Sequence, residues 1–351
     1  MPRQMLCIVL ALLLAAVGLG GCASFSAISP QTVTWLDVFN TVSTLTVYGV
    51  EADSFQIGAE ALHDRLLEYH RLFDIYHSYD GMNNLKTVND HAGQPVTVAE
   101  PILDLLEYGL TAYEQTGGRV NILFGSVLML WHDSRTQALE SPAQAALPDP
   151  AALSAAAAHT DPVTLVIDRE AGTVCLTDPD SRLDVGAVAK GYAVELAAKY
   201  AAEELGITTA LLDVGGNVRA IGGKPAARGQ TPFLIGVRNP EADSARPYLK
   251  MVGLRDMAAV TSGDDQRYFE VDGKRYNHII DPDTLQPATR YRSVTVLCPD
   301  SGLADVLSTA LFILPLQEGL NLLGKFKEAE ALWVLPDGSL RQSADFEVYE
   351  K

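Results

Sequence analysis

The sequence is poor in positive charge. Its 351 residues include 26 Lys and Arg against 44 Asp and Glu, which gives a formal net charge of −18. Proteins that bind the phosphate backbone of nucleic acids need clustered Lys and Arg, and no basic block occurs in this sequence. A nucleic-acid partner is therefore excluded.

Cysteine is also scarce. The four Cys residues are too few and too scattered for a disulfide framework or a zinc site. The histidines other than His278 have no Cys or carboxylate at metal-ligand spacing, which argues against zinc. Cys175 and Cys298 lie in strand-like segments, where isolated thiols are commonly small buried hydrophobic side chains. A disulfide between these two residues remains an alternative.

Two nucleotide-binding signatures are missing. The segment Asp184–Tyr192 has glycines and a lysine but not the spacing of a P-loop. The segment Gly215–Gly222 lacks the dinucleotide fingerprint, and no ribose-binding acid follows at the proper distance. A Rossmann domain is therefore rejected. Hydrophobic residues make up 48% of the chain, which indicates a folded protein with a sizeable core.

The first residues are typical of a secretory signal. Arg3 precedes an apolar run from Leu6 to Leu19, which is short for a membrane span of about 20 residues. Leu19-Gly20-Gly21-Cys22 resembles the lipobox of bacterial lipoproteins, and this resemblance implies cleavage before Cys22 and a diacylglycerol on its sulfur. We therefore expect an extracytoplasmic protein anchored to a bacterial membrane. An ordinary signal peptide, or an uncleaved anchor with Cys22 incidental, is the alternative.

This interpretation divides the chain into three parts. Residues 1–21 are the signal peptide, 22–33 a lipidated tether, and 34–351 one catalytic domain. β-branched stretches alternate with stretches of helical periodicity, and many of the strand pairs are joined by short turns. The pattern predicts an α+β fold with antiparallel sheets and packed helices, not a series of βαβ units.

Four clusters of glycine, carboxylate and small polar residues could carry chemistry. Asp184–Tyr192 leads into a helix, where Lys190 and backbone N–H groups could meet a phosphate. Thr261–Asp265 could contact a substrate. In Tyr276–Pro282, His278 precedes a carboxylate by three residues and is suited to proton transfer. Asp305 and Thr309 share one helix face and could hold one hard cation.

Each cluster also has a plain structural interpretation. Lys190 could be a solvated lysine at a glycine-containing helix start, and Thr261–Asp265 an ordinary hairpin turn. His278 could be a structural histidine at a strand end. Asp305 could be solvated, with the Thr309 hydroxyl bonded back to its own helix.

Taken in order, the clusters resemble the ApbE family of FAD:protein FMN transferases, over nearly all of the chain from about Asp37. The segments that carry the resemblance are Phe39–Tyr48, Phe73–Tyr76, Asn83–Asn89, Val120–Gly125 with Trp131-His132, Asp184–Tyr192, Leu212–Asn217, Thr261–Asp264, His278–Pro282, and Ala304-Asp305 with Ser308-Thr309.

The resemblance implies a fold, an activity and a set of site residues. The fold is an ApbE-like, tandem T-fold-related α+β domain. The activity is Mg²⁺-dependent transfer of FMN from FAD to a Thr or Ser hydroxyl, with release of AMP, on extracytoplasmic flavoprotein subunits of membrane redox complexes. His278 matches the catalytic base. The metal ligands are Ala187, Asp305 and Thr309, and the flavin-binding positions are Val42, Asn84, Leu85, Lys86, Asn121, Lys190 and Ile280.

The sequence departs from the family pattern at three positions. Asn121 stands where many members have Asp, which leaves the metal set intact. Asn277 replaces a common second His, so His278 is the one candidate imidazole. Leu285 replaces a common Gly, which puts the local turn in question. Two further functions fit the same residues: an FAD pyrophosphatase that yields FMN and AMP, and a flavin-binding lipoprotein without catalysis.

Overall fold

The computed structural model describes residues 29–241 and 244–351. The predicted signal peptide, Cys22 and most of the predicted tether lie outside the described residues. Within these two ranges, none of the helices combines the length and the apolar character that a membrane crossing requires.

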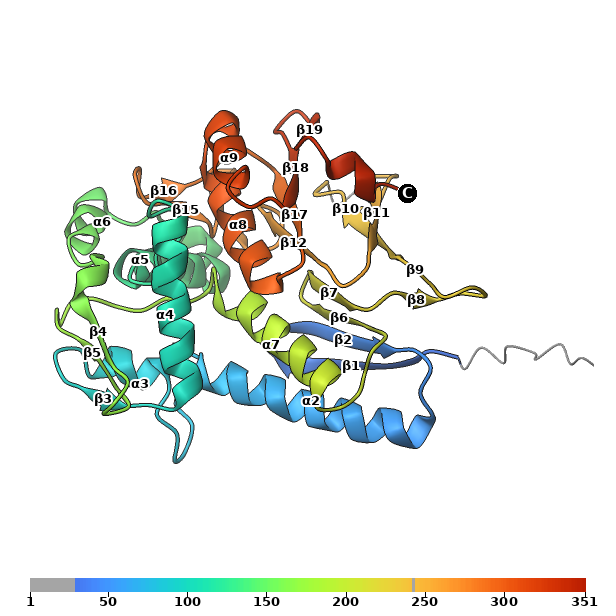
Figure 1. Ribbon diagram of the computed structural model, residues 1–351. Coiled ribbons are helices and arrows are strands. Elements are labelled where there is room, and N and C mark those ends of the chain that lie inside the picture. Colours follow the sequence, from blue (N-terminus) through green and yellow to red (C-terminus); the bar gives the residue numbers. More distant parts are fainter. Residues whose placement is uncertain (1–28, 242–243) are drawn as a thin grey trace, which may run out of the picture.

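An eight-stranded antiparallel sheet forms the centre of the molecule (Figure 1). Antiparallel neighbours can be joined by short hairpins, which explains the turn-rich sequence. β17, which lies inside the sheet, is buried along its whole length. The strands, in spatial order, are β1 (Gln31–Val38), β2 (Thr41–Val47), β6 (Ala210–Val214), β7 (Asn217–Ile221), β12 (Ala258–Gly263), β17 (Ser293–Cys298), β18 (Glu330–Val334) and β19 (Leu340–Gln342).

Three helices cover one face of this sheet (Figure 1). They are α2 (Ala52–Leu72), α7 (Ala189–Glu203) and α8 (Ser301–Ile313), and α9 (Leu316–Leu323) follows α8. Leu62 and Leu66 of α2 are fully buried against Leu45 and Leu212 of the sheet. Their helical spacing is what the sequence pattern predicts for a helix with one buried side.

The opposite face of the sheet is covered by a hairpin and the C-terminal segment. β10 (Phe233–Arg238) pairs with β11 (Tyr248–Leu254), and a short 3₁₀ helix spans Phe346–Tyr349. Phe233, Leu254 and Phe346 are buried there against Leu297 and Leu332 of the sheet. The β8–β9 hairpin (Lys224–Pro225 with Gln230–Thr231) extends away from the body on the same side of the molecule (Figure 1).

The remaining elements form a helical layer beside the sheet. The helices are α3 (Leu85–Asp90), α4 (Glu100–Gln115), α5 (Gly125–Glu140) and α6 (Pro150–Ala157). The small sheets are β3 (Val96–Thr97) with β5 (Thr173–Leu176) and β4 (Leu165–Asp168), β13 (Tyr268–Val271) with β14 (Lys274–Asn277), and β15 (Ile280–Asp281) with β16 (Gln286–Pro287).

The predicted α+β architecture with antiparallel sheets is confirmed, and two element boundaries differ. β1 begins at Gln31, so residues 31–33 of the predicted tether belong to a strand. The spacing of apolar residues over 59–76 predicts a helix that continues to Tyr76, but α2 ends at Leu72, because Asp74 Oδ1 accepts the backbone N–H of Tyr76 at 2.7 Å. Such a local side-chain bond offers the backbone an alternative to the helix.

The structure also describes the two cysteines and the turn at Leu285. Cys175 and Cys298 are both free thiols, so the alternative of a disulfide between them is not realised. Leu285, where the family resemblance predicts glycine, has a φ of +57°, and its carbonyl accepts the Trp131 indole N–H at 3.0 Å. A left-handed Leu costs about 1–2 kcal/mol, and this hydrogen bond helps to hold it.

Candidate active site

The carboxylate of Asp305 is buried where α7 crosses α8. Asp305 Oδ2 accepts the backbone N–H of Gly191 at 2.8 Å, and Lys190 Nζ lies 3.8 Å from Oδ1. A Cβ on Gly191 would stand 2.4 Å from Asp305 Cβ and 2.6 Å from the Ser301 carbonyl oxygen. Only glycine therefore allows this crossing. Burial raises the pKa of Asp305, and the charge of Lys190 opposes that rise.

Hydroxyl groups stand beside this carboxylate. Thr309 follows Asp305 by one helical turn, and its Oγ1 lies 3.5 Å from Ser262 Oγ of β12. Ser262 Oγ is also 2.8 Å from Ser308 Oγ. Ala187, partly buried, lies two residues before α7. Carboxylate, hydroxyl and carbonyl oxygens are the ligands that Mg²⁺ prefers, so this donor set fits such an ion.

Among the described residues, Asp305 belongs to no group of three His, Cys, Asp or Glu side chains that could together hold a metal ion. Mg²⁺ is commonly bound by one or two carboxylates together with substrate phosphates and water. The single buried carboxylate, held by one amine and one N–H, is therefore compatible with an ion that is shared with a substrate.

Positive side chains act on two buried carboxylates. The charge of Arg267 lowers the pKa values of both Asp305 and Asp184, although burial raises them overall. Arg135 lies near enough to Arg267 for the two charges to repel, and burial together with that repulsion lowers the pKa of Arg135. Lys190 completes the set. Within a chain of net charge −18, this concentration of cations indicates an anion-binding site.

His278 joins β14 to β15. Its backbone N–H and its Nδ1 both lie 3.1 Å from the Arg267 carbonyl oxygen. A carbonyl can only accept, so Nδ1 carries the proton and Nε2 keeps its lone pair.

The titration of His278 favours the neutral ring. Desolvation first, and the charges of Arg267 and Arg135 next, lower its pKa to about 4. The side chain is also exposed to solvent, which relieves part of this desolvation and leaves the ring accessible. A neutral imidazole with a free Nε2 at pH 7 has the state that a general base requires.

An aromatic pair lies close to these charges. The rings of Tyr76 and His132 stack with centroids 4.9 Å apart. Burial, with the charge of Asp184 adding to it, raises the pKa of Tyr76 to about 12. His132 Nδ1 lies 3.4 Å from an Arg135 guanidinium nitrogen. The pair therefore offers a flat apolar surface next to the cations.

Three of the predicted flavin-binding residues lie together at the start of α3. The Asn84 side chain is fully buried; it caps α3 and donates to the carbonyls of Arg71 and His77. Leu85 is fully buried, and Lys86 Nζ lies 2.5 Å from Asp90 Oδ2. The groups of Asn84 are thus used within the protein, and flavin contact by these three residues stays a prediction.

The other predicted flavin contacts are dispersed over three elements. Asn121 accepts from the backbone N–H of Leu123 and donates to the Thr160 carbonyl. Ile280 is buried in the cluster around Trp131, whereas Val42 is largely exposed on β2. Only Lys190 of the predicted flavin residues is shown next to the Asp305 carboxylate. No described contact tests the remaining assignments.

A buried polar network braces the crossing of α7 and α8. Glu195, one turn after Gly191, pairs with Arg219 of β7 at 2.9 Å and accepts the backbone N–H of Ser301 at 2.9 Å. Ser301 Oγ donates to Asn217 Oδ1 at 2.6 Å. Although burial opposes it, the hydrogen bond and charge of Arg219 lower the pKa of Glu195. The two helices are therefore joined at successive turns, by Gly191–Asp305 and by Glu195–Ser301.

We expect Arg219→Met to lower the free energy of unfolding by about 2–3 kcal/mol, because the buried Glu195 loses its hydrogen-bonded guanidinium and keeps only the half-exposed Lys199 amine, 3.6 Å away. Urea titration of both proteins measures this difference. The double variant Arg219→Met/Glu195→Gln should recover much of the loss, since no unpaired charge remains. Breaking the exposed Arg275–Glu270 pair is the matched control, with an effect of about 1 kcal/mol or less. An Arg219→Met effect of that small size would contradict a structural role for the network.

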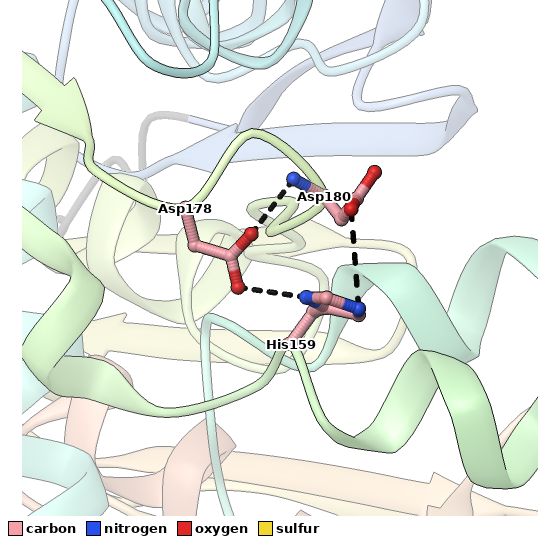
Figure 2. A group of neighbouring side chains, drawn as sticks. All are labelled: His159, Asp178 and Asp180. Atoms are coloured by element: carbon pink, nitrogen blue, oxygen red, sulfur yellow. Dashed lines mark hydrogen bonds and ion pairs between the residues drawn. The ribbon is translucent and has the colours of Figure 1, made fainter.

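A second polar cluster lies outside this site. His159 Nδ1 is 2.7 Å from Asp178 Oδ2, and Asp178 Oδ1 accepts the backbone N–H of Asp180 at 2.9 Å (Figure 2). His159 Nε2 lies 4.0 Å from Asp180 Oδ2. The sequence spacing did not indicate this group, because the carboxylates follow the histidine by about twenty residues. Hydrogen bonds within the cluster account for its geometry.

Sequence reasoning missed several site residues. It did not select Arg135, Arg267 or Tyr76 as functional, and it did not use Ser262 as an oxygen donor. Arg135 and Arg267 lie 132 positions apart and belong to no common spacing pattern. The one sequence signal for any of these residues was the position of Arg267, two residues after the Thr261–Asp265 cluster.

Comparison with known proteins agrees with this architecture. The sequence profile of the ApbE family matches residues 39–333. The chain is 37% identical over 272 residues to the FAD:protein FMN transferase of Treponema pallidum (strain Nichols), covering 74% of this chain and 73% of that protein. It is 30% identical over 281 residues to an FAD:protein FMN transferase of Klebsiella pneumoniae (strain 342), covering 78% and 83%.

Solved structures are similar as well. The ApbE protein of Thermotoga maritima MSB8 superimposes with a TM-score of 0.80 at 28% identity, over 92% of this chain and all of that one. The apo form of the Pseudomonas stutzeri flavinyl transferase ApbE gives a TM-score of 0.75 at 25% identity, over 93% and 98%.

The fold and the relatives define an enzyme of the transferase class. Because the family profile covers most of the sequence, the chain belongs to the ApbE family.

Proposed function

We propose that the chain is an FAD:protein FMN transferase that attaches FMN to a Thr or Ser hydroxyl of an acceptor protein and releases AMP. The observation that carries this proposal is that the charge of Arg267 acts on both the His278 ring and the buried Asp305 carboxylate, which the Lys190 amine also approaches. A base, an anion site and a cation site are the parts that phosphoryl transfer requires. The names of the relatives support the choice of FAD as donor.

The residues of the chain supply the proton transfer and the positioning. The acceptor hydroxyl oxygen attacks the phosphorus of the FMN half, and its proton passes to His278 Nε2. The bond from that phosphorus to the oxygen of the AMP phosphate breaks, and AMP leaves with the bonding electrons. Lys190, Arg135 and Arg267 hold the phosphates in place and offset their charge.

Asp305 and Thr309, with the carbonyl of Ala187, would hold Mg²⁺ next to the bound pyrophosphate. The chemistry that the ion supplies when bound is neutralisation of the negative charge that develops on the leaving phosphate. The hard oxygen donors and the partly compensated carboxylate of Asp305 support this assignment.

The N-terminal sequence supports a location of the reaction outside the cytoplasm. The lipobox-like segment that ends at Cys22 supports a lipoprotein outside the cytoplasm. Acceptors would then be extracytoplasmic flavoprotein subunits of membrane redox complexes, which share that compartment.

A second activity is favoured by one observation. The His278 side chain is exposed to solvent, so water can reach the same base. Attack by water instead of an acceptor hydroxyl would give FMN and AMP, and the chain would act as an FAD pyrophosphatase.

One assay separates the candidate functions. The protein is incubated with FAD and Mg²⁺, with and without an acceptor domain that carries a target Thr. Fluorescent FMN bound to the acceptor, together with one AMP per FMN, is the expected result. Free FMN and AMP in the absence of acceptor would assign the pyrophosphatase activity. FAD binding without any turnover would overturn both and leave a flavin carrier.

A further inference from the structure

A cavity of about 580 Å³ opens on the side of the sheet opposite to Asp305. Two amines and an apolar surface line it, a combination that suits an amphipathic anion. Tyr48 and Phe233 pack there with ring centroids 5.5 Å apart. The lining residues are Tyr48, Leu211, Lys224, Pro225, Thr231, Pro232, Phe233, Leu234 and Lys351.

The sequence around this cavity reverses the charge balance of the chain. Residues 222–255 contain six Lys and Arg but only two acidic residues, Glu241 and Asp243, whereas the whole chain has 26 against 44. The β8–β9 hairpin and strands β10 and β11 fall within this range. The excess of positive charge is therefore local to one end of the molecule.

Four exposed cations form what we term the cationic surface: Lys224, Arg228, Arg255 and Lys351. Lys224 and Lys351 line the cavity, and Arg228 lies in the β8–β9 turn. The Arg255 side chain packs beside Gly223, the residue before β8. Among the described residues, none of the four forms an ion pair with a carboxylate side chain.

Two acidic side chains border the cationic surface, and both are engaged. Asp256 accepts the backbone N–H of Gly222, and Glu350 pairs with Lys250 at 2.7 Å. Lys250 balances the charge of Glu350, whereas Asp256 keeps its negative charge, so the two carboxylates offset the four cations only in part.

The chain enters the described structure at the rim of this cavity. Gln31, the first residue of β1, pairs with Val47 of β2. Tyr48, which follows Val47 in the chain, lines the cavity. Cys22 precedes Ser29 by seven residues, which span at most about 25 Å. A lipid on Cys22 would therefore hold this end of the molecule close to a membrane.

We propose that the cationic surface faces the membrane and binds the phosphate groups of anionic phospholipids. An acidic chain tethered to an anionic leaflet is repelled over most of its surface, whereas Lys and Arg near the leaflet are attracted. The Asp305 site lies on the opposite face of the sheet, so docking leaves it open to an acceptor. This inference concerns orientation, and it does not depend on the transferase reaction.

The test uses the full chain reconstituted into vesicles. Lysines are acetylated with an amine-reactive reagent in phosphatidylcholine vesicles and in vesicles that also contain phosphatidylglycerol, and mass spectrometry measures labelling at each site. We expect labelling of Lys224 and Lys351 to fall at least about threefold in the anionic vesicles and to recover in high salt. Labelling of the exposed Lys325 and Lys327 should not change. Equal labelling of all four lysines in both vesicles would overturn the proposal.

A matched pair of variants tests the cause. Lys224→Glu/Arg228→Glu should abolish the protection of Lys351, whereas Lys325→Glu/Lys327→Glu should preserve it with the same change in net charge. Protection that survives both variants would contradict an electrostatic surface. Protection that appears only with an added acceptor protein, and not with lipid, would replace the lipid by a protein partner. Transfer to a soluble acceptor in detergent should stay unchanged in both variants, which separates this inference from the proposed function.

Discussion

Replacement of Asp305 by Asn should lower the rate of FMN transfer at least about a hundredfold at saturating FAD. The amide keeps the size of the side chain and can still accept the Gly191 N–H, but it removes the negative charge that would hold Mg²⁺. Steady-state transfer to an acceptor domain measures the rate.

A readout apart from activity distinguishes loss of metal from loss of structure. Mg²⁺ should raise the melting temperature of the native protein, since a ligand that binds only the folded state stabilises it, and the shift should vanish in Asp305→Asn. Asp300→Asn is the matched control on the same helix. Asp300 Oδ1 caps α8 through the N–H of Leu303, and Asn caps equally well. Full activity with an unchanged Mg²⁺ shift in Asp305→Asn would exclude Asp305 as a ligand.

The His278→Ala variant should transfer FMN about 100-fold to 10,000-fold more slowly, the range over which a positioned general base acts. FAD binding, followed by flavin fluorescence, should be retained, because the ring acts on the acceptor hydroxyl and not on the flavin. His91→Ala is the control: its Nδ1 also lies within 2.8 Å of a backbone carbonyl, that of Thr87, on an exposed side chain. Equal transfer rates in the His278→Ala and native proteins would remove His278 as the base.

The pH profile offers an independent check on this base. The reactive form is the neutral imidazole, and desolvation with the charges of Arg267 and Arg135 lowers its pKa from 6.5 to about 4. The transfer rate should therefore stay level as the pH falls from 8 through 6.5 and decline only at a lower pH, as Nε2 takes up a proton. A rate that is already halved near pH 6.5 would show an unshifted histidine.

Local patterns in the sequence predict several of the helices and strands. The apolar spacing of Leu62 and Leu66 indicated α2, and the β-branched run from Thr41 indicated β2. The Asp305–Thr309 pair was recognisable because i and i+4 lie on one side of any helix. These features depend on neighbours within a few residues, and such neighbours are visible in a sequence.

The rest of the site depends on contacts between distant segments. Gly191 and Asp305 are 114 positions apart and meet only because α7 and α8 cross on the sheet. The sheet places β7 beside β12 and β12 beside β17, and periodicity does not encode that order. Arg135 and Arg267 come from a helix and from a loop before β13, so nothing in either local sequence predicts their shared location.

His278 and Asp305 belong to different structural units, so the two parts of the site differ in local stability. Asp305 lies on a helix buried against the eight-stranded sheet, so its position is lost only when that core opens. His278 lies between two hairpins of two strands each, a unit that is marginally stable on its own and is held here by the cluster around Trp131 and Phe269. Native-state fluctuations can thus displace the base while the cation-binding half stays folded. Occupancy of both halves by one dinucleotide would couple them, so the substrate itself would set how much of the time the catalytic geometry is complete.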